Sequence, residues 1–180
     1  MKSKNRTSLI LLVTALLIAP LATAEKEHKE AHQHKPYVGS VQLEKMKTLA
    51  GTWKGTSTME AGKPVTVEYR ISSAGSTVVE TWFPGAPDEM VSVYHDADGK
   101  LEMTHYCALH NQPRMSLRKN AGDQIDLVYS GGENIDVKKD AHMHAVKFSF
   151  PEKGKMVQNW AFYDAGENKG INTMTLSKAP

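Results

Sequence analysis

The feature that most constrains this chain is an alternation of apolar and polar residues that begins near Trp53 and recurs almost to the C-terminal end. Residues 65–71 (VTVEYRI) and 101–107 (LEMTHYC) show it clearly, and turn residues such as Asp98-Gly99 separate successive runs. A period of two places neighbouring side chains on opposite faces of a β-strand. The pattern predicts about ten strands, near residues 52–58, 64–72, 76–83, 89–95, 100–107, 113–119, 124–130, 142–150, 155–163 and 171–177.

The connections between these runs are too short for crossover helices, which argues against parallel pairing. A long antiparallel meander tends to close on itself because closure removes its exposed edges. We therefore predict an all-β fold, an antiparallel up-and-down β-barrel of about ten strands, with a two-sheet sandwich as the alternative. A short N-terminal helix is expected within residues 39–50, where Ser40 is a capping residue and Gly51 ends the apolar 3.6-residue period. A barrel of this size can leave space inside for a small ligand.

The first 24 residues have the layout of a secretory signal peptide. A basic start is followed by an apolar run from Leu9 to Ile18, and Ala22-Thr23-Ala24 offers a cleavage site. The alternative is a membrane anchor, but ten residues of helix reach only about 15 Å, half of a hydrocarbon core of about 30 Å. We expect a signal peptide over residues 1–24, export to a bacterial periplasm, no membrane span after cleavage, a leader over residues 25–38 and a barrel domain over residues 39–180.

The predicted leader is rich in charge and carries His28, His32 and His34. On a helix, His28 and His32 would stand one turn apart and could share a metal ion as neutral imidazoles. The other interpretation is a solvated tail with only incidental affinity for transition metals.

The charge of the chain argues against nucleic-acid binding, and its cysteine content excludes internal disulfides and cysteine-based zinc sites. Of the 22 basic residues, Lys2, Lys4 and Arg6 belong to the predicted signal peptide, which leaves 19 against 20 acidic residues. Nucleic-acid binding needs a basic field, and this composition provides none. The single cysteine excludes a disulfide within the chain and a cysteine-based zinc cage.

Two blocks carry a family resemblance. The run LEKMKTLAGTWKGTS, residues 43–57, resembles the opening of lipocalin-like barrels of the calycin superfamily. The resemblance implies that Trp53 plugs one end of the barrel, that Gly51 allows the tight passage from helix to strand, and that Gly55 allows close approach of a neighbouring strand. Residues 90–115 resemble a block in a largely uncharacterised, unknown-function family of bacterial proteins assigned to the same lipocalin-like set.

The haem-binding nitrobindins are a more distant likeness. They also open with G-x-W-x-G, which residues 51–55 match, and their proximal histidine comes from a late strand. The corresponding candidates in this chain are His142 and His144, although the surrounding residues do not follow the nitrobindin pattern.

Polar and reactive side chains gather between residues 94 and 114. If Leu101 and Met103 face the interior, His105 and Cys107 share that face about 6–7 Å apart, and the loop that follows would lie at the rim. The predicted ligand contacts are Tyr94, His105, Cys107, Asn111, Gln112 and Arg114. Each has a purely structural alternative, such as a buried inert thiol for Cys107 or a hydrogen-bonded core residue for His105.

We therefore expect an exported barrel that holds a small, mainly apolar molecule in its interior. Three alternatives stay open at this point: metal or haem binding through His105 or through His142 and His144, an enzyme that uses His105 and Cys107, and a structural barrel whose interior is filled. No established catalytic motif is present, and neither the cofactor nor the oligomeric state follows from the sequence.

The first prediction concerns processing. N-terminal sequencing of the protein recovered after export should begin at Glu25, because cleavage is expected after Ala24. An exported protein that begins at Met1 would contradict the assignment of a signal peptide.

Overall fold

The structure, a computed structural model, describes residues 35–59, 61, 63–118 and 124–180. The predicted signal peptide and the leader histidines His28, His32 and His34 lie outside the described residues. The described part contains helix α1 (Val41–Lys47), the 3-10 turn η1 (Ser73–Gly75) and the strands β1 (Gly51–Ser57), β2 (Pro64–Ser72), β3 (Thr77–Trp82), β4 (Met90–Ala97), β5 (Lys100–Tyr106), β6 (Gln112–Leu117), β7 (Asp126–Glu133), β8 (His142–Ser149), β9 (Lys155–Asp164) and β10 (Glu167–Lys178).

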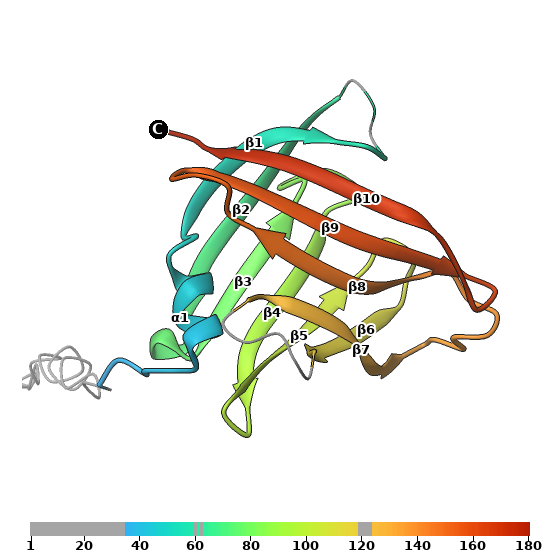
Figure 1. Ribbon diagram of the computed structural model, residues 1–180, viewed down its shortest axis with the longest axis horizontal. Coiled ribbons are helices and arrows are strands. Elements are labelled where there is room, and N and C mark those ends of the chain that lie inside the picture. The colour runs from blue at the N-terminus through green and yellow to red at the C-terminus, as the bar shows by residue number, and fades with distance from the viewer. Residues whose placement is uncertain (1–34, 60, 62, 119–123) are drawn as a thin grey trace, which may run out of the picture. The chain divides into compact units, whose positions relative to one another are not determined.

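The ten strands form one closed antiparallel barrel in which each strand pairs with its neighbours in the chain (Figure 1). Closure comes from β1 and β10, which pair from Trp53 opposite Lys178 to Ser57 opposite Met174. The predicted up-and-down barrel with a short N-terminal helix is thus confirmed, and the two-sheet sandwich is wrong. Among the described residues, no helix is long and apolar enough to cross a membrane.

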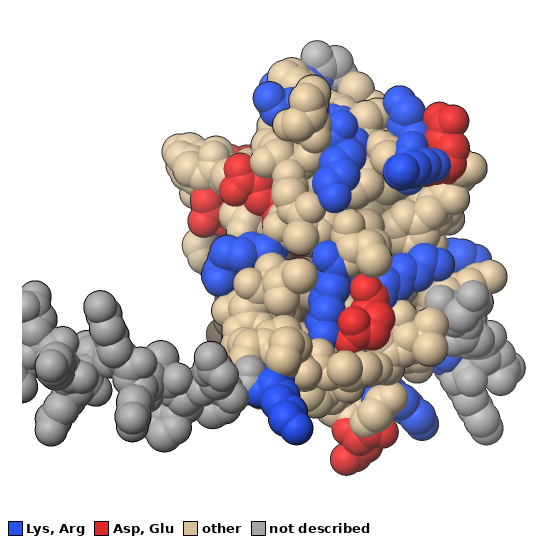
Figure 2. All heavy atoms as spheres, turned by 90° about the vertical axis from the view of Figure 1, so that its left-hand side faces the viewer, with Lys and Arg blue, Asp and Glu red and all other residues tan. Residues whose placement is uncertain are grey.

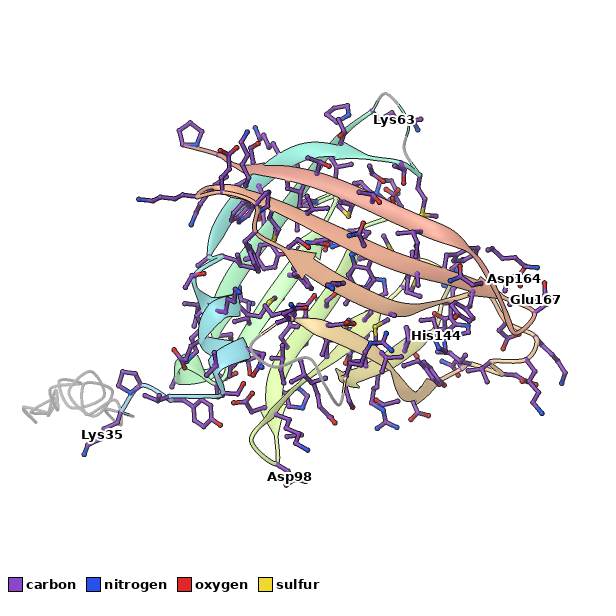
Figure 3. The ribbon with its side chains drawn as sticks, in the orientation of Figure 1. Lys35, Lys63, Asp98, His144, Asp164 and Glu167 are labelled. Atoms are coloured by element: carbon purple, nitrogen blue, oxygen red, sulfur yellow. The ribbon has the colours of Figure 1, made fainter. Side chains whose placement is uncertain are left out.

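Two-residue turns set the register at two hairpins. Asp98 and Gly99 between β4 and β5 both have positive φ, as do Ala165 and Gly166 between β9 and β10 (Figure 3). Positive φ at both positions is the mark of a turn whose twist matches that of the flanking strands. The second turn brings Glu167 directly opposite Asp164, so β10 begins four residues before the predicted start.

Helix α1 closes one end of the barrel (Figure 1). Ser40 caps it by accepting a hydrogen bond from the Leu43 amide at 3.1 Å, and the Ser40 hydroxyl donates to the Asp96 carboxylate at the end of β4 at 2.7 Å. The apolar face of the helix is buried, and the Trp53 indole beneath it donates to the Leu49 carbonyl at 2.7 Å. Trp53 therefore occupies the plug position that the resemblance implies.

Two glycines are required at this end. Gly51 has a φ of +120°, which side chains rarely adopt, at the passage from helix to strand. A Cβ on Gly55 would lie 1.8 Å from the Thr175 carbonyl oxygen of β10. Only glycine permits β1 and β10 to approach so closely, and this approach belongs to the pairing that closes the barrel.

Lysines border the closed end on the outside. Figure 2 views this face and shows basic side chains spread over it with a few carboxylates among them. Lys45 lies over the Phe150 ring at 4.8 Å, and Lys178 lies over the Trp53 ring at 5.8 Å. These side chains cover the aromatic rings from outside, as long charged side chains do when they bury their stems on apolar surface.

Candidate functional site

A pocket opens at the end of the barrel opposite α1. It has a volume of about 210 Å³ and is formed where β1, β3, β5 and β9 end and where β4 and β8 begin, together with the middle of β10. Its polar lining residues are Ser57, Asp88 and Asn172, and the rest of its lining is Met59, Trp82, Phe83, Met90, Cys107, Ala108, Leu109, Met143 and Phe162. We refer to it as the mouth pocket. Half of its lining residues are aromatic or methionine and most of the lining is apolar, as expected of a site for an apolar ligand.

The inner wall of the mouth pocket is an aromatic stack. Trp82 packs edge-on against Trp160 at 5.0 Å between ring centroids, and the His105 ring lies 6.0 Å from Trp82 and 5.1 Å from Trp160. All three side chains are at most 2% exposed. Of the three, only Trp82 also lines the pocket, so its ring separates the pocket from the filled interior.

Beneath this stack lies a buried carboxylate that is not among the predicted ligand contacts. Glu80 is fully buried and accepts hydrogen bonds from the Tyr69 hydroxyl at 2.6 Å, the Tyr94 hydroxyl at 2.6 Å and the Gln158 amide at 2.8 Å. The Gln158 amide also contacts the Tyr69 hydroxyl, and its carbonyl oxygen accepts from the Trp160 indole at 2.7 Å. We call these five residues the Glu80 network.

A signal for Glu80 was present in the sequence. Val78, Glu80 and Trp82 occupy alternate positions of β3, so two buried apolar residues place the carboxylate on the inward face. A buried charge needs hydrogen-bond partners, and these come from β2, β4 and β9. Burial, followed by the nearby Glu80 charge, raises the pKa of Tyr69 and of Tyr94 well above 10, so both phenols stay protonated donors.

His105 faces inward, as predicted, directly opposite Ser92. Its Nδ1 lies 2.9 Å from the Ser92 hydroxyl, whereas its Nε2 has no hydrogen-bond partner among the described residues. Burial lowers the pKa of His105 from 6.5 to about 4. The imidazole is therefore neutral at pH 7.

Cys107 lies just beyond the end of β5, where it lines the mouth pocket. Its thiol is 4.0 Å from the Met90 sulfur, and burial raises the pKa of the thiol. A nucleophilic cysteine needs a lowered thiol pKa, usually with a base within hydrogen-bond distance of the thiol. Within the described part of the chain, no hydrogen bond joins Cys107 to His105, so the two do not form a nucleophile–base pair.

The other predicted contacts lie away from the mouth pocket. Tyr94 belongs to the Glu80 network, Asn111 is buried and donates to the Ala141 carbonyl at 2.8 Å, and Gln112 accepts from Asn134 at 3.0 Å. Arg114 is exposed and lies along Gly131 on the outside of β6. None of these four side chains lines the pocket, so Cys107 alone of the six predicted contacts does so.

His142 and His144 form a separate cluster where β7 and β8 diverge. A β-bulge interrupts β8 between Met143 and Ala145. The Asp140 carbonyl accepts a hydrogen bond from His142 Nδ1 at 2.8 Å, and His142 Nε2 lies 3.0 Å from His144 Nδ1 in a second hydrogen bond.

Aromatic rings enclose this pair. His144, labelled in Figure 3, stacks on Tyr163 at 4.0 Å and on Tyr129 at 5.5 Å. Burial and the neighbouring His142 lower the pKa of His144. In the described part of the chain, no three His, Cys, Asp or Glu side chains come together in a group that could hold a metal ion. The pair is accounted for as a hydrogen-bonded cluster that fills the gap between β7 and β8.

No family model matches the chain, and no curated protein matches it. The closed ten-stranded antiparallel barrel with a short N-terminal helix is consistent with a lipocalin-like fold.

The burial of His105 generates a prediction about stability and pH. Because the pKa of His105 is near 4 in the folded protein and near 6.5 when unfolded, the unfolded chain takes up the proton first as pH falls. The free energy of unfolding should therefore fall by about 3 kcal/mol from this group between pH 6.5 and pH 4. Urea unfolding of the wild type and of His105→Gln at pH 7 and pH 4.5 measures the difference.

The variant should be less stable at pH 7 but should lose less stability on acidification. His110→Asn is the matched control, since His110 is exposed and asparagine tolerates its φ of +63°. An equal loss of stability on acidification in the wild type and in His105→Gln would contradict this account.

Proposed function

We propose that this chain binds a small, mainly apolar molecule in the mouth pocket. The observation that carries the proposal is an apolar pocket at one end of a barrel whose other end is closed by α1 and Trp53. Burial of apolar ligand surface supplies the affinity, at about 25 cal/mol per Å². The Glu80 network and the aromatic stack fill the barrel beneath the pocket, so the proposed site is the mouth and not the whole interior.

The size of the mouth pocket limits the ligand. Its volume of about 210 Å³ lies below the range of roughly 300–1,000 Å³ for sites that take drug-sized molecules. An apolar cavity of about 150 Å³ holds benzene. The proposed ligand is therefore about the size of one substituted ring.

The environment of Cys107 favours binding over catalysis. Its raised pKa keeps the thiol protonated, and the inward-facing His105 has no hydrogen bond to it. The protonated thiol then contributes a weakly polar contact to the lining of the pocket. For the histidine alternative, both ring nitrogens of His142 already take part in hydrogen bonds, one with the Asp140 carbonyl and one with His144 Nδ1.

The calycin resemblance supports the same proposal. Trp53 under the helix, Gly51 at the start of β1 and the close approach at Gly55 have the roles that this family implies for them. We propose on these grounds that the chain is a calycin-type binding barrel, exported to the periplasm after cleavage of residues 1–24. We propose further that the chain is similar to the unknown-function family of the same lipocalin-like set, which residues 90–115 resemble.

The single cysteine makes the pocket testable without a known ligand. If ethylbenzene occupies the mouth pocket, it covers Cys107, because this residue is part of the lining. Modification of Cys107 by 5,5′-dithiobis(2-nitrobenzoic acid) should slow by at least about fivefold at saturating ethylbenzene, with a hyperbolic dependence on its concentration. The release of thionitrobenzoate measures the rate.

A relocated thiol is the control. In Cys107→Ser combined with Thr104→Cys, the thiol is on the outward face of β5, and ethylbenzene should leave its rate unchanged. Cys107 protection that never saturates, or equal slowing at both positions, would reject the mouth pocket as the binding site.

A further inference from the structure

Trp82, which lines the mouth pocket, carries a buried hydrogen-bond donor without a partner in the described part of the chain. Trp82 is 2% exposed, and its indole Nε1–H has no hydrogen-bond partner among the described residues. The other two tryptophans differ, because Trp53 donates to the Leu49 carbonyl and Trp160 donates to Gln158. A buried donor without a partner is destabilising, and such a group in a native protein calls for a partner from elsewhere.

Asn172 offers a second donor in the lining of the mouth pocket. Its side-chain oxygen accepts from the Ser57 hydroxyl at 2.7 Å and from the Met59 amide at 3.2 Å. These contacts fix the orientation of the amide, because the Met59 N–H can only donate. The nitrogen of the Asn172 side chain then has no hydrogen-bond partner within the described ranges, although, unlike Trp82 Nε1, it is not a fully buried atom.

The charges around the pocket restrict the ligand further. Asp88 is the one charged residue among the described lining residues, and no lysine or arginine is among them. His105, behind the Trp82 ring, is neutral at pH 7. A ligand with a carboxylate or phosphate would lose its hydration on entering the pocket. No cation among the described lining residues would compensate for this loss, and Asp88 would lie nearby, so binding of an anion in this apolar site is unfavourable.

The walls match a ring. Trp82, Phe83 and Phe162 supply three aromatic faces, and the thioethers of Met90 and Met143 make favourable contacts with aromatic ring edges. A flat ring fills a small space of this kind with little loss of conformational entropy. The vacant hydrogen-bonding groups then determine which polar atom the ring carries.

We infer that the ligand is a neutral ring compound that carries a carbonyl or similar acceptor oxygen, and that this oxygen accepts a hydrogen bond from Trp82 Nε1–H. The inference rests on the proposed function, since it concerns the same pocket. Asn172 is the second donor available to the oxygen. The pocket selects neutral ligands because no cation is among its described lining residues. The ligand oxygen supplies the hydrogen-bond acceptor that the described residues do not provide for Trp82 Nε1–H.

Three probes of nearly equal size test the inference: ethylbenzene, acetophenone and benzoate. Acetophenone should bind the full chain roughly five- to tenfold more tightly than ethylbenzene, since it satisfies a buried donor. Benzoate should bind at least about tenfold more weakly than acetophenone. In Trp82→Phe, which keeps a ring but removes the N–H, acetophenone should lose its advantage over ethylbenzene. Trp53→Phe is the matched control and should keep it.

A second measurement on the wild type guards against misfolding of the variants. The three indole N–H resonances in ¹⁵N NMR spectra report each tryptophan separately. Acetophenone should move the Trp82 resonance downfield and leave the already bonded Trp53 and Trp160 protons nearly in place. Ethylbenzene should produce a smaller shift without the downfield change.

The outcomes separate the two proposals. Equal affinity for acetophenone and ethylbenzene, or a preference that survives in Trp82→Phe, would overturn the inference while the mouth pocket stands. Failure of all three probes to bind would overturn the proposed function itself. A preference for benzoate would contradict the selection of neutral ligands.

Discussion

The pairing of β1 with β10 is the constraint on which the rest of this structure depends. It converts an open meander into a barrel and gives the alternating strands an inside. The pairing requires glycine at position 55, where the Thr175 carbonyl occupies the place of a Cβ. Once the barrel is closed, every second residue of each strand has to be accommodated in a limited volume, and the size of those side chains decides where space is left.

The interior is filled unevenly along the barrel axis. At one end, α1 and Trp53 close the opening. In the middle, the Glu80 network replaces apolar packing with hydrogen bonds that hold strands β2, β3, β4 and β9 together. Above it, the rings of Trp82, Trp160 and His105 form a layer, and beyond this layer the mouth pocket is lined from strand ends and loops. Because these buried polar residues fill the middle of the barrel, the site is a pocket at one end and not a deep cavity.

Much of the fold followed from local sequence signals. Alternation located all ten strands to within a few residues, because each signal, such as Val65–Ile71 or the Asp98-Gly99 turn, lies within one hairpin. The site was predicted less well. The alternation of side chains along β5 correctly predicts that His105 faces inward. The same alternation along β6 indicates that Arg114 points outward, because its neighbour Met115 is buried, and the structure agrees. The alternation of β3 places Glu80 on the inward face as well, but its hydrogen-bond partners come from three other strands, and no short window of sequence identifies them.

The central claim is that the barrel is packed up to the Trp82 ring and left empty beyond it. A crystal structure of the full chain under xenon pressure tests this most directly, since xenon enters dry apolar cavities. The account predicts a xenon atom in the mouth pocket, against Trp82, Met143 and Phe162, and none beside Glu80. Xenon in the middle of the barrel, or a mouth pocket without xenon at saturating pressure, would contradict it.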